Sequence, residues 1–281
     1  MNKYLLLIVI LATAACAHVA VTAANVPALL SDQRITRDVD FGSDYGSRLD
    51  IYQPADMHAP HPVIVFYYGG AWKTGSKEDY RFVADAFTSR GYVVVIPDYP
   101  KYPKVKFQDW QKDAAKSFAW AHEHIKAYGG NPMQVYIVGH SAGAHIGALL
   151  AADPSYLKAE KGETSWIRAF AGMAGPYSFE PYEPDFIDMF GPPERYPLMM
   201  VDTRISGKQP PMLLLWGKAD KDVGYENMEK LEAAIKQKGG EAQVKLYDDM
   251  GHIDIIASMA KLSTVTAPVA DDIDRFFKQY R

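Results

Sequence analysis

The stretch Gln134-Val135-Tyr136-Ile137-Val138-Gly139-His140-Ser141-Ala142-Gly143-Ala144-His145 decides the fold of this chain. It runs from a short β-branched and aromatic strand through Gly-His-Ser-Ala-Gly into a helix of small residues, which is typical of a nucleophile elbow. Side chains larger than glycine at positions 139 and 143 would collide with the neighbouring strand and helix. The pattern predicts that Ser141 is an exposed nucleophile at a helix N-terminus, where the backbone N–H of Ala142 points outward toward a developing oxyanion.

A second glycine motif, Tyr67-Tyr68-Gly69-Gly70-Ala71-Trp72, follows the apolar run 62–67. A glycine turn before a core tryptophan is the structural alternative. Because the motif ends a buried strand ahead of the elbow, we interpret it as a loop whose backbone N–H groups complete an oxyanion hole with that of Ala142.

A serine hydroxyl needs a base and an orienting acid, and in this architecture they follow the serine in the order acid, then histidine. His252 is the one histidine beyond the elbow region, so it is the predicted base. Asp220 is the first carboxylate after the predicted strand 211–216, and Asp222 is the alternative acid. Carboxylates in the loop of His252 itself are expected to be solvated or to cap helices.

Strands and helices alternate along the chain. Continuous apolar runs predict strands buried in a mostly parallel sheet, and apolar residues at helical spacing predict helices between them. The fold class is therefore α/β, with a mostly parallel central sheet and helices on both faces. Ligands in such sheets sit at the carboxyl ends of the strands. The predicted strands are 36–41, 48–52, 62–67, 92–96, 135–138, 167–171, 211–216 and 244–247.

From the segment 49–54 to His252 the chain resembles the α/β-hydrolases of the carboxylesterase and arylformamidase-like group, whose members carry His-Gly-Gly-x-Trp and Gly-x-Ser-Ala-Gly. The resemblance implies the α/β-hydrolase fold. It implies Ser141 as nucleophile, Asp220 as acid and His252 as base. The implied oxyanion donors are Gly70, Ala71 and Ala142. Tyr68 departs from the pattern, because the family has a histidine there that helps to hold the oxyanion loop.

The aromatic segment 176–182, with Phe186, Met189 and Phe190, is either core or the roof of the substrate pocket. Its place after the strand 167–171 favours the roof. We expect Trp72, Tyr68, Tyr177 and Phe179 to line this pocket. His122 and His124 are not expected to bind a metal, since residues two apart on a helix face different sides.

The N-terminus indicates export. Residues 1–24 combine Lys3, an apolar run and small residues, as a secretory signal requires. Cys16, the only cysteine, ends a sequence that resembles a lipoprotein box, so a lipoprotein signal to residue 15 is one expectation and cleavage near Ala24 is the other. Residues 25–281 form the predicted catalytic domain, in the periplasm, secreted or anchored by lipid.

The charge of the chain indicates no charged binding partner. The net charge is −4, with 30 Lys and Arg against 34 Asp and Glu and no dense basic run, so neither nucleic acid nor a polybasic membrane contact is expected. We expect the protein to contact a membrane only through a lipid on Cys16. We predict hydrolysis of small or aromatic carboxylic esters through an acyl-enzyme, without a cofactor or metal. The alternatives are an arylformamidase-type amide hydrolase and a catalytically inactive binding protein of the same fold.

Overall fold

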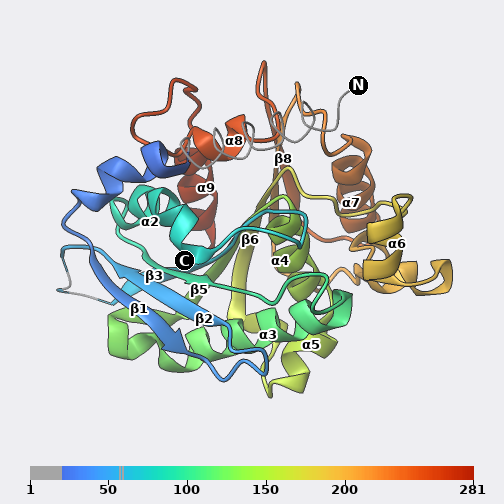
Figure 1. The fold of residues 1–281 in the computed structure, drawn as a ribbon, viewed down its shortest axis with the longest axis horizontal. Coiled ribbons are helices and arrows are strands. Elements are labelled where there is room, and N and C mark those ends of the chain that lie inside the picture. The colour runs from blue at the N-terminus through green and yellow to red at the C-terminus, as the bar shows by residue number, and fades with distance from the viewer. Residues whose placement is uncertain (1–20, 57, 59) are drawn as a thin grey trace, which may run out of the picture.

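The structure, a computed structural model, describes residues 21–56, 58 and 60–281. One eight-stranded sheet runs through it in the order β1-β2-β4-β3-β5-β6-β7-β8, and helices pack around the sheet (Figure 1). The predicted α/β class is confirmed. The strands are β1 (Arg34–Asp40), β2 (Arg48–Gln53), β3 (His61–Tyr67), β4 (Val93–Pro97), β5 (Gly130–His140), β6 (Ile167–Met173), β7 (Met212–Gly217) and β8 (Ala242–Tyr247).

The α-helices follow the predicted apolar stripes, with short additional helices in the connections. Gly91 lies in the turn before β4 and Gly129 in the turn before β5. Their φ values of 84° and 77° are in the left-handed region, where a residue with a side chain would be strained. The labelled helices are α2 (Arg81–Thr88), α3 (Phe107–His124), α4 (Ala142–Ala152), α5 (Pro154–Ala159), α6 (Pro184–Phe190), α7 (Glu226–Gln237), α8 (Asp254–Ala257) and α9 (Val269–Phe277).

The two edges of the sheet differ. β1 and β2 pair antiparallel, and β2 pairs antiparallel with β4, whereas every later pair is parallel. β4 is buried along its whole length, as expected of a strand covered on both faces. An ion pair of Arg90 with Asp271 joins the end of α2 to α9, so these helices lie together, while α3 packs against α4 and α5 (Figure 1).

The register of the central strands aligns their carboxyl ends. Tyr67 at the end of β3 pairs with Gly139 of β5, and Gly139 pairs with Gly172 of β6. The segments that leave these strands therefore meet at one edge of the sheet, which is where a ligand binds in open parallel sheets.

The expected signal segment, 1–24, lies mostly outside the described residues, and so does Cys16. Among the residues that the structure does describe, no helix combines the length and the apolar character that a membrane span needs.

Candidate active site

The elbow has the geometry that its glycines predict. Ser141 stands between β5 and α4 with φ 53° and ψ −124°, a left-handed conformation that a non-glycine residue adopts only under constraint. A Cβ on Gly143 would lie 2.0 Å from the carbonyl oxygen of Tyr67, and one on Gly139 would lie 2.5 Å from that of Gly143. Both positions therefore require glycine, and α4 can press against the end of β3.

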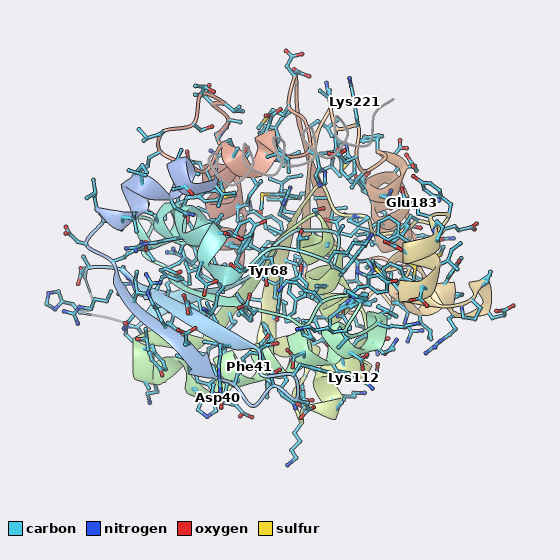
Figure 2. All side chains as sticks on the ribbon, viewed as in Figure 1. Asp40, Phe41, Tyr68, Lys112, Glu183 and Lys221 are labelled. Carbon is cyan, nitrogen blue, oxygen red and sulfur yellow. The ribbon has the colours of Figure 1, made fainter. Side chains whose placement is uncertain are left out.

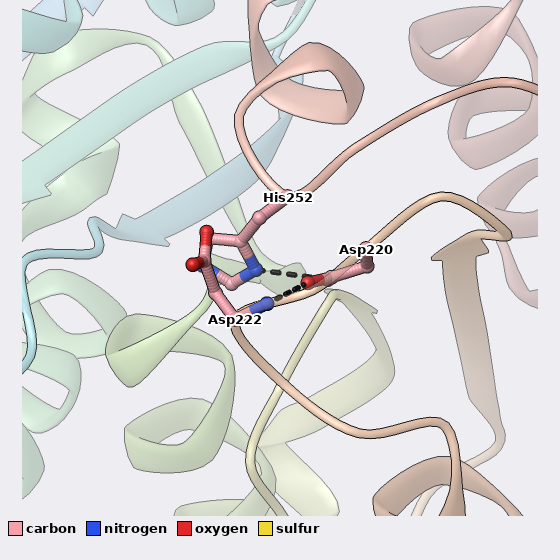
Figure 3. Close-up of side chains that lie close together, drawn as sticks. All are labelled: Asp220, Asp222 and His252. Carbon is pink, nitrogen blue, oxygen red and sulfur yellow. Dashed lines mark hydrogen bonds and ion pairs between the residues drawn. The ribbon is translucent and has the colours of Figure 1, made fainter.

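Three side chains form a chain of hydrogen bonds at this edge. His252 Nε2 lies 2.8 Å from Ser141 Oγ, and His252 Nδ1 lies 2.9 Å from Asp220 Oδ2. Figure 3 shows the bond between His252 and Asp220, which come from the loops after β8 and β7. The three residues that the sequence nominates as nucleophile, base and acid thus meet within hydrogen-bond distance.

The surroundings of Asp220 keep it ionised. Burial raises its pKa, but the hydrogen bonds from His252 and from the backbone N–H groups of Val223 and Asp222 outweigh burial and lower the pKa below its usual value. An ionised carboxylate only accepts, so His252 must carry its proton on Nδ1. Its Nε2 lone pair is then turned toward the Ser141 hydroxyl, as proton abstraction requires.

Asp222 supports the acid through its main chain, since its backbone N–H donates to Asp220 Oδ1 at 2.9 Å (Figure 3). In the described part of the chain, Asp220, Asp222 and His252 are the one group whose ligand atoms, within 4.8 Å of one another, could surround an ion. Both ring nitrogens of His252 are already engaged, so binding an ion there would break the hydrogen-bond chain.

The second glycine motif forms a tight loop against the nucleophile. Gly70, Ala71 and Trp72 all have positive φ, at 132°, 51° and 59°. A Cβ on Gly69 would lie 3.0 Å from Ser141 Cβ, so the loop can approach only without a side chain there. Strained backbone of this kind is concentrated at functional sites. Gly70, Ala71 and Ala142 border the same cavity as Ser141 and His252, which is the arrangement the predicted oxyanion hole needs.

This cavity has a volume of about 860 Å³ and one apolar wall. Trp72, Phe179 and Phe186 belong to that wall, and Trp72 stacks on Phe179 with ring centroids 6.1 Å apart. Its rim carries the carboxylates of Glu183, Asp222 and Glu226. Figure 2 labels Glu183 beside α6, on the right of the view.

Two residues expected to line the pocket lie elsewhere. Tyr177 is 1% exposed, with its ring packed against Gly172 and Phe170 in the core. Tyr68 is fully buried and lies between Tyr80 and Tyr99. The prediction was wrong for these two because their rings pack into the aromatic core instead of turning toward the cavity. The aromatic segment is thus both roof and core.

Residues 49–180 match the BD-FAE family. The match contains the elbow and the glycine loop whose geometry is described above. In sequence and in fold the chain is similar to the α/β-hydrolases. The predicted resemblance to the carboxylesterase and arylformamidase-like group is confirmed by relatives of both kinds.

The chain is 29% identical over 244 residues to the probable isoprenylcysteine alpha-carbonyl methylesterase ICME of Oryza sativa subsp. japonica, covering 79% of the chain and 59% of that protein. It is 28% identical over 134 residues to the kynurenine formamidase of Danio rerio, covering 48% of the chain and 44% of that protein. The chain therefore spans about half the length of the curated relatives it matches. A solved structure of Thermogutta terrifontis esterase 2 with butyrate bound has the same fold, with a TM-score of 0.72, 21% identity and coverage of 88% and 94%.

Tyr68 stands where the family that the chain resembles has histidine, and it anchors the glycine loop after β3. Its hydroxyl donates to Asp98 Oδ1 at 2.5 Å, and its carbonyl accepts from the Tyr99 hydroxyl at 3.1 Å. Asp98 also accepts from the backbone N–H of Lys77. The loop is thus tied to the end of β4. Sequence reasoning did not single out Asp98 for this role, although its position just past a strand end was a usable signal.

Tyr68→Phe should therefore destabilise the protein by about 1–3 kcal/mol, because the buried Tyr68 hydroxyl donates a charge-assisted hydrogen bond to the Asp98 carboxylate, whose side chain is 24% exposed. Urea unfolding measures this. Tyr45→Phe is the matched control, since Tyr45 donates to Asp109 at 2.8 Å on the surface and its loss should cost no more than about 0.5 kcal/mol. Equal effects of the two variants would contradict an anchoring role for Tyr68.

Two histidines flank the nucleophile and are buried in the neutral form. His140 is 2% exposed and His145 is fully buried. Burial lowers the pKa of His140 to about 3 and that of His145 to about 4. His145 Nε2 lies 2.8 Å from the carbonyl oxygen of Met199. His122 and His124, by contrast, stack on Trp166 and Trp120 in separate places.

These lowered pKa values make the fold sensitive to acid. In the unfolded chain a histidine has a pKa of about 6.5. Below this pH the histidines bind protons in the unfolded chain but stay neutral in the native state. Stability should thus fall as the pH drops from about 6.5 to about 4.5, by up to about 1.4 kcal/mol per pH unit for each histidine. The same lowering at His122 adds in this direction. Urea unfolding at several pH values tests it; His145→Gln should reduce the slope, and an unchanged slope would contradict the assignment.

Proposed function

We propose that the protein hydrolyses carboxylic esters through an acyl-enzyme. The observation that carries this is the hydrogen-bond chain from Ser141 through His252 to Asp220. His252 takes the Ser141 proton as Oγ attacks the ester carbonyl carbon, and the carbonyl oxygen becomes an oxyanion held by backbone N–H groups of the glycine loop and of Ala142. His252 gives the proton to the leaving alcohol. A water, deprotonated by the same imidazole, then attacks the acyl-serine and releases the carboxylic acid.

The cavity supports small or aromatic substrates. A volume of about 860 Å³ accommodates a compact ester, and the wall of Trp72, Phe179 and Phe186 offers aromatic rings for an apolar acyl or alcohol group. The rice relative is named a methylesterase, and the bacterial esterase was solved with butyrate, a short acyl group. Both names are compatible with a small ester in this pocket.

A panel of p-nitrophenyl esters with increasing acyl length tests the proposal. We expect a burst of one p-nitrophenol per chain followed by steady turnover, with kcat/KM highest for short or aromatic acyl groups. An N-formyl arylamine in the same assay tests the arylformamidase alternative, which the formamidase relative favours. Turnover of the formamide alone would replace the proposed reaction, and no turnover of either would support an inactive binding protein.

The rim of the cavity should select against negative substrates. Glu183, Asp222 and Glu226 face it, and the one cation among the lining residues, Lys73, lies 2.7 Å from Asp185 and is neutralised by it. We expect kcat/KM for an ester of a dicarboxylic acid with one free carboxylate to be roughly tenfold below that of a neutral ester of equal length at low salt. The difference should shrink as salt screens the exposed charges. Glu226→Gln should also reduce the difference in kcat/KM between the charged and the neutral ester. If neither salt nor this substitution changed the difference, the charges of the rim would not be its cause.

We also infer that the enzyme works outside the cytoplasm, on the signal-like character of residues 1–24. An extracytoplasmic enzyme meets envelope or environmental esters, which favours ester over formamide hydrolysis. Mass spectrometry of the native protein distinguishes a lipid-modified Cys16 from a plain N-terminus near Ala24. A full-length species in the cytoplasm would contradict this inference.

A further inference from the structure

His140 ends β5, directly before the nucleophile, and its side chain reaches the loop that carries the base. His140 Nε2 lies 3.0 Å from the backbone carbonyl oxygen of His252, and the two rings have centroids 5.0 Å apart. A carbonyl oxygen only accepts, so His140 is the donor and carries its proton on Nε2. The strand that holds the serine therefore also holds the main chain of the base.

The other side of the His140 ring faces the glycine loop. A Cβ on Gly69 would lie 3.0 Å from His140 Nδ1, so the loop rests on the ring itself. This nitrogen is buried and finds no hydrogen-bond partner among the described residues. His140 is thereby enclosed by the three parts of the site: the serine, the loop of the oxyanion donors and the loop of the base.

The loop of His252 has few other attachments to the acid and nucleophile. Its Met250 carbonyl accepts from the N–H of Ala219 at 2.9 Å, which ties it to the loop of Asp220. The N–H of Gly251 bonds to Asp254 Oδ2 at 2.8 Å, within the loop itself. The bond from the His140 side chain ties the main chain of this loop to the strand of the nucleophile. Without it, the bond from Ala219 to Met250 and the bonds of the His252 ring to Asp220 and Ser141 would have to hold the base in place.

We propose that His140 is a positioning residue that fixes the backbone of His252, and with it the imidazole, at attacking distance from Ser141. This inference rests on the proposed hydrolysis. It requires a neutral donor: His252 becomes an imidazolium during the reaction, and a second positive charge 5.0 Å away would oppose it. Burial, together with the facing His252, holds the pKa of His140 near 3, so the residue donates without competing for the serine proton.

Two amide variants test the proposal. Gln places its amide nitrogen about where His140 Nε2 lies, whereas Asn is one methylene shorter and does not reach the His252 carbonyl. We expect His140→Asn to lower kcat by roughly 10- to 100-fold with KM nearly unchanged, because small displacements of catalytic groups cost about this much. His140→Gln should recover kcat to within roughly fivefold of the wild type. Both variants bury a polar amide, so a purely structural role would affect them alike.

A second readout does not depend on ester turnover. A fluorophosphonate reacts with Ser141 only when the base is aligned, so its second-order labelling rate should follow the same order: wild type, Gln, then Asn. His145→Asn is the control for a buried histidine on the same elbow, and it should lose stability without slowing the labelling to the level of His140→Asn. The acid limb of the kcat/KM profile should also move for His140→Asn and not for His145→Asn.

Equal kcat and equal labelling for Gln and Asn at position 140 would overturn the proposal. If neither variant folds at 25 °C, by circular dichroism, the residue is structural and the proposal is likewise overturned. If the wild type labels with fluorophosphonate but hydrolyses no ester, the proposed function fails while the labelling order still decides the role of His140.

Discussion

Ser141→Ala should remove ester turnover by more than about four orders of magnitude and leave the fold unchanged. The hydroxyl is the atom that becomes covalently bonded to the acyl group, so neither His252 nor the backbone donors can substitute for it. The lost atom is small, and its hydrogen-bond partner within the described part of the chain is His252 Nε2, at 2.8 Å. Steady-state rates with a short p-nitrophenyl ester, together with thermal unfolding of the same preparation, measure both parts of the expectation.

A serine remote from the cavity provides the control for Ser141→Ala. Ser165 donates to Glu163 on the surface, and Ser165→Ala should retain full activity. If Ser141→Ala kept more than about a tenth of the wild-type rate, another group would have to be the nucleophile, since losses of triad members are far larger than this.

Asp220→Asn should lower kcat by roughly three to four orders of magnitude near neutral pH. The asparagine oxygen can still accept from the N–H groups of Asp222 and Val223, which turns its NH₂ toward His252. An NH₂ only donates, so His252 Nδ1 must become an acceptor and the ring proton moves to Nε2. In that tautomer Nε2 cannot take the proton of Ser141. The expected defect is thus in kcat, with the folded state retained.

Asp222→Asn is the matched comparison for Asp220→Asn. Its carboxylate is exposed, and the variant keeps the backbone N–H that supports Asp220. We expect kcat to stay within roughly threefold of the wild type, because an exposed charge acts on the site through screened Coulomb forces. The reverse order of the two variants would make Asp222 the acid and would contradict the hydrogen bond from His252 to Asp220.

The sequence carries much of the fold because the signals are local. Buried strands such as β4 are unbroken apolar runs in the sequence. Gly139 and Gly143 indicate positions where any side chain would collide with the backbone. The start of β5 was placed five residues late, at Val135, because Asn131 and Pro132 interrupt the apolar run while the strand already pairs at Gly130. Strand order and the antiparallel edge depend on long-range pairing, which no local pattern encodes.

The site was predictable where chemistry limits the choice and not where packing decides. Few residues can serve as nucleophile, base or acid, so position along the chain sufficed to nominate Ser141, His252 and Asp220. Two of the four residues predicted for the pocket wall lie in the core. Whether Tyr68 or Trp72 faces the cavity depends on backbone angles in a strained loop, which the sequence does not show. The contact of His140 with the His252 carbonyl joins residues 112 positions apart and leaves no trace in the sequence.

The framework of the nucleophile and the wall of the cavity come from different parts of the chain. All eleven residues of α4 are buried, Gly143 lies against the backbone of Tyr67, and Gly147 lies against the side chains of Ile137 and Phe170, so almost any exchange there disturbs folding. Phe179, Glu183 and Phe186 lie in the connection between β6 and β7, which carries many exposed positions. Mutations at the exposed positions of this connection change which substrates fit the cavity without changing the sheet and α4. Substrate preference can therefore change through mutations in this connection while Ser141, His252 and Asp220 stay in place.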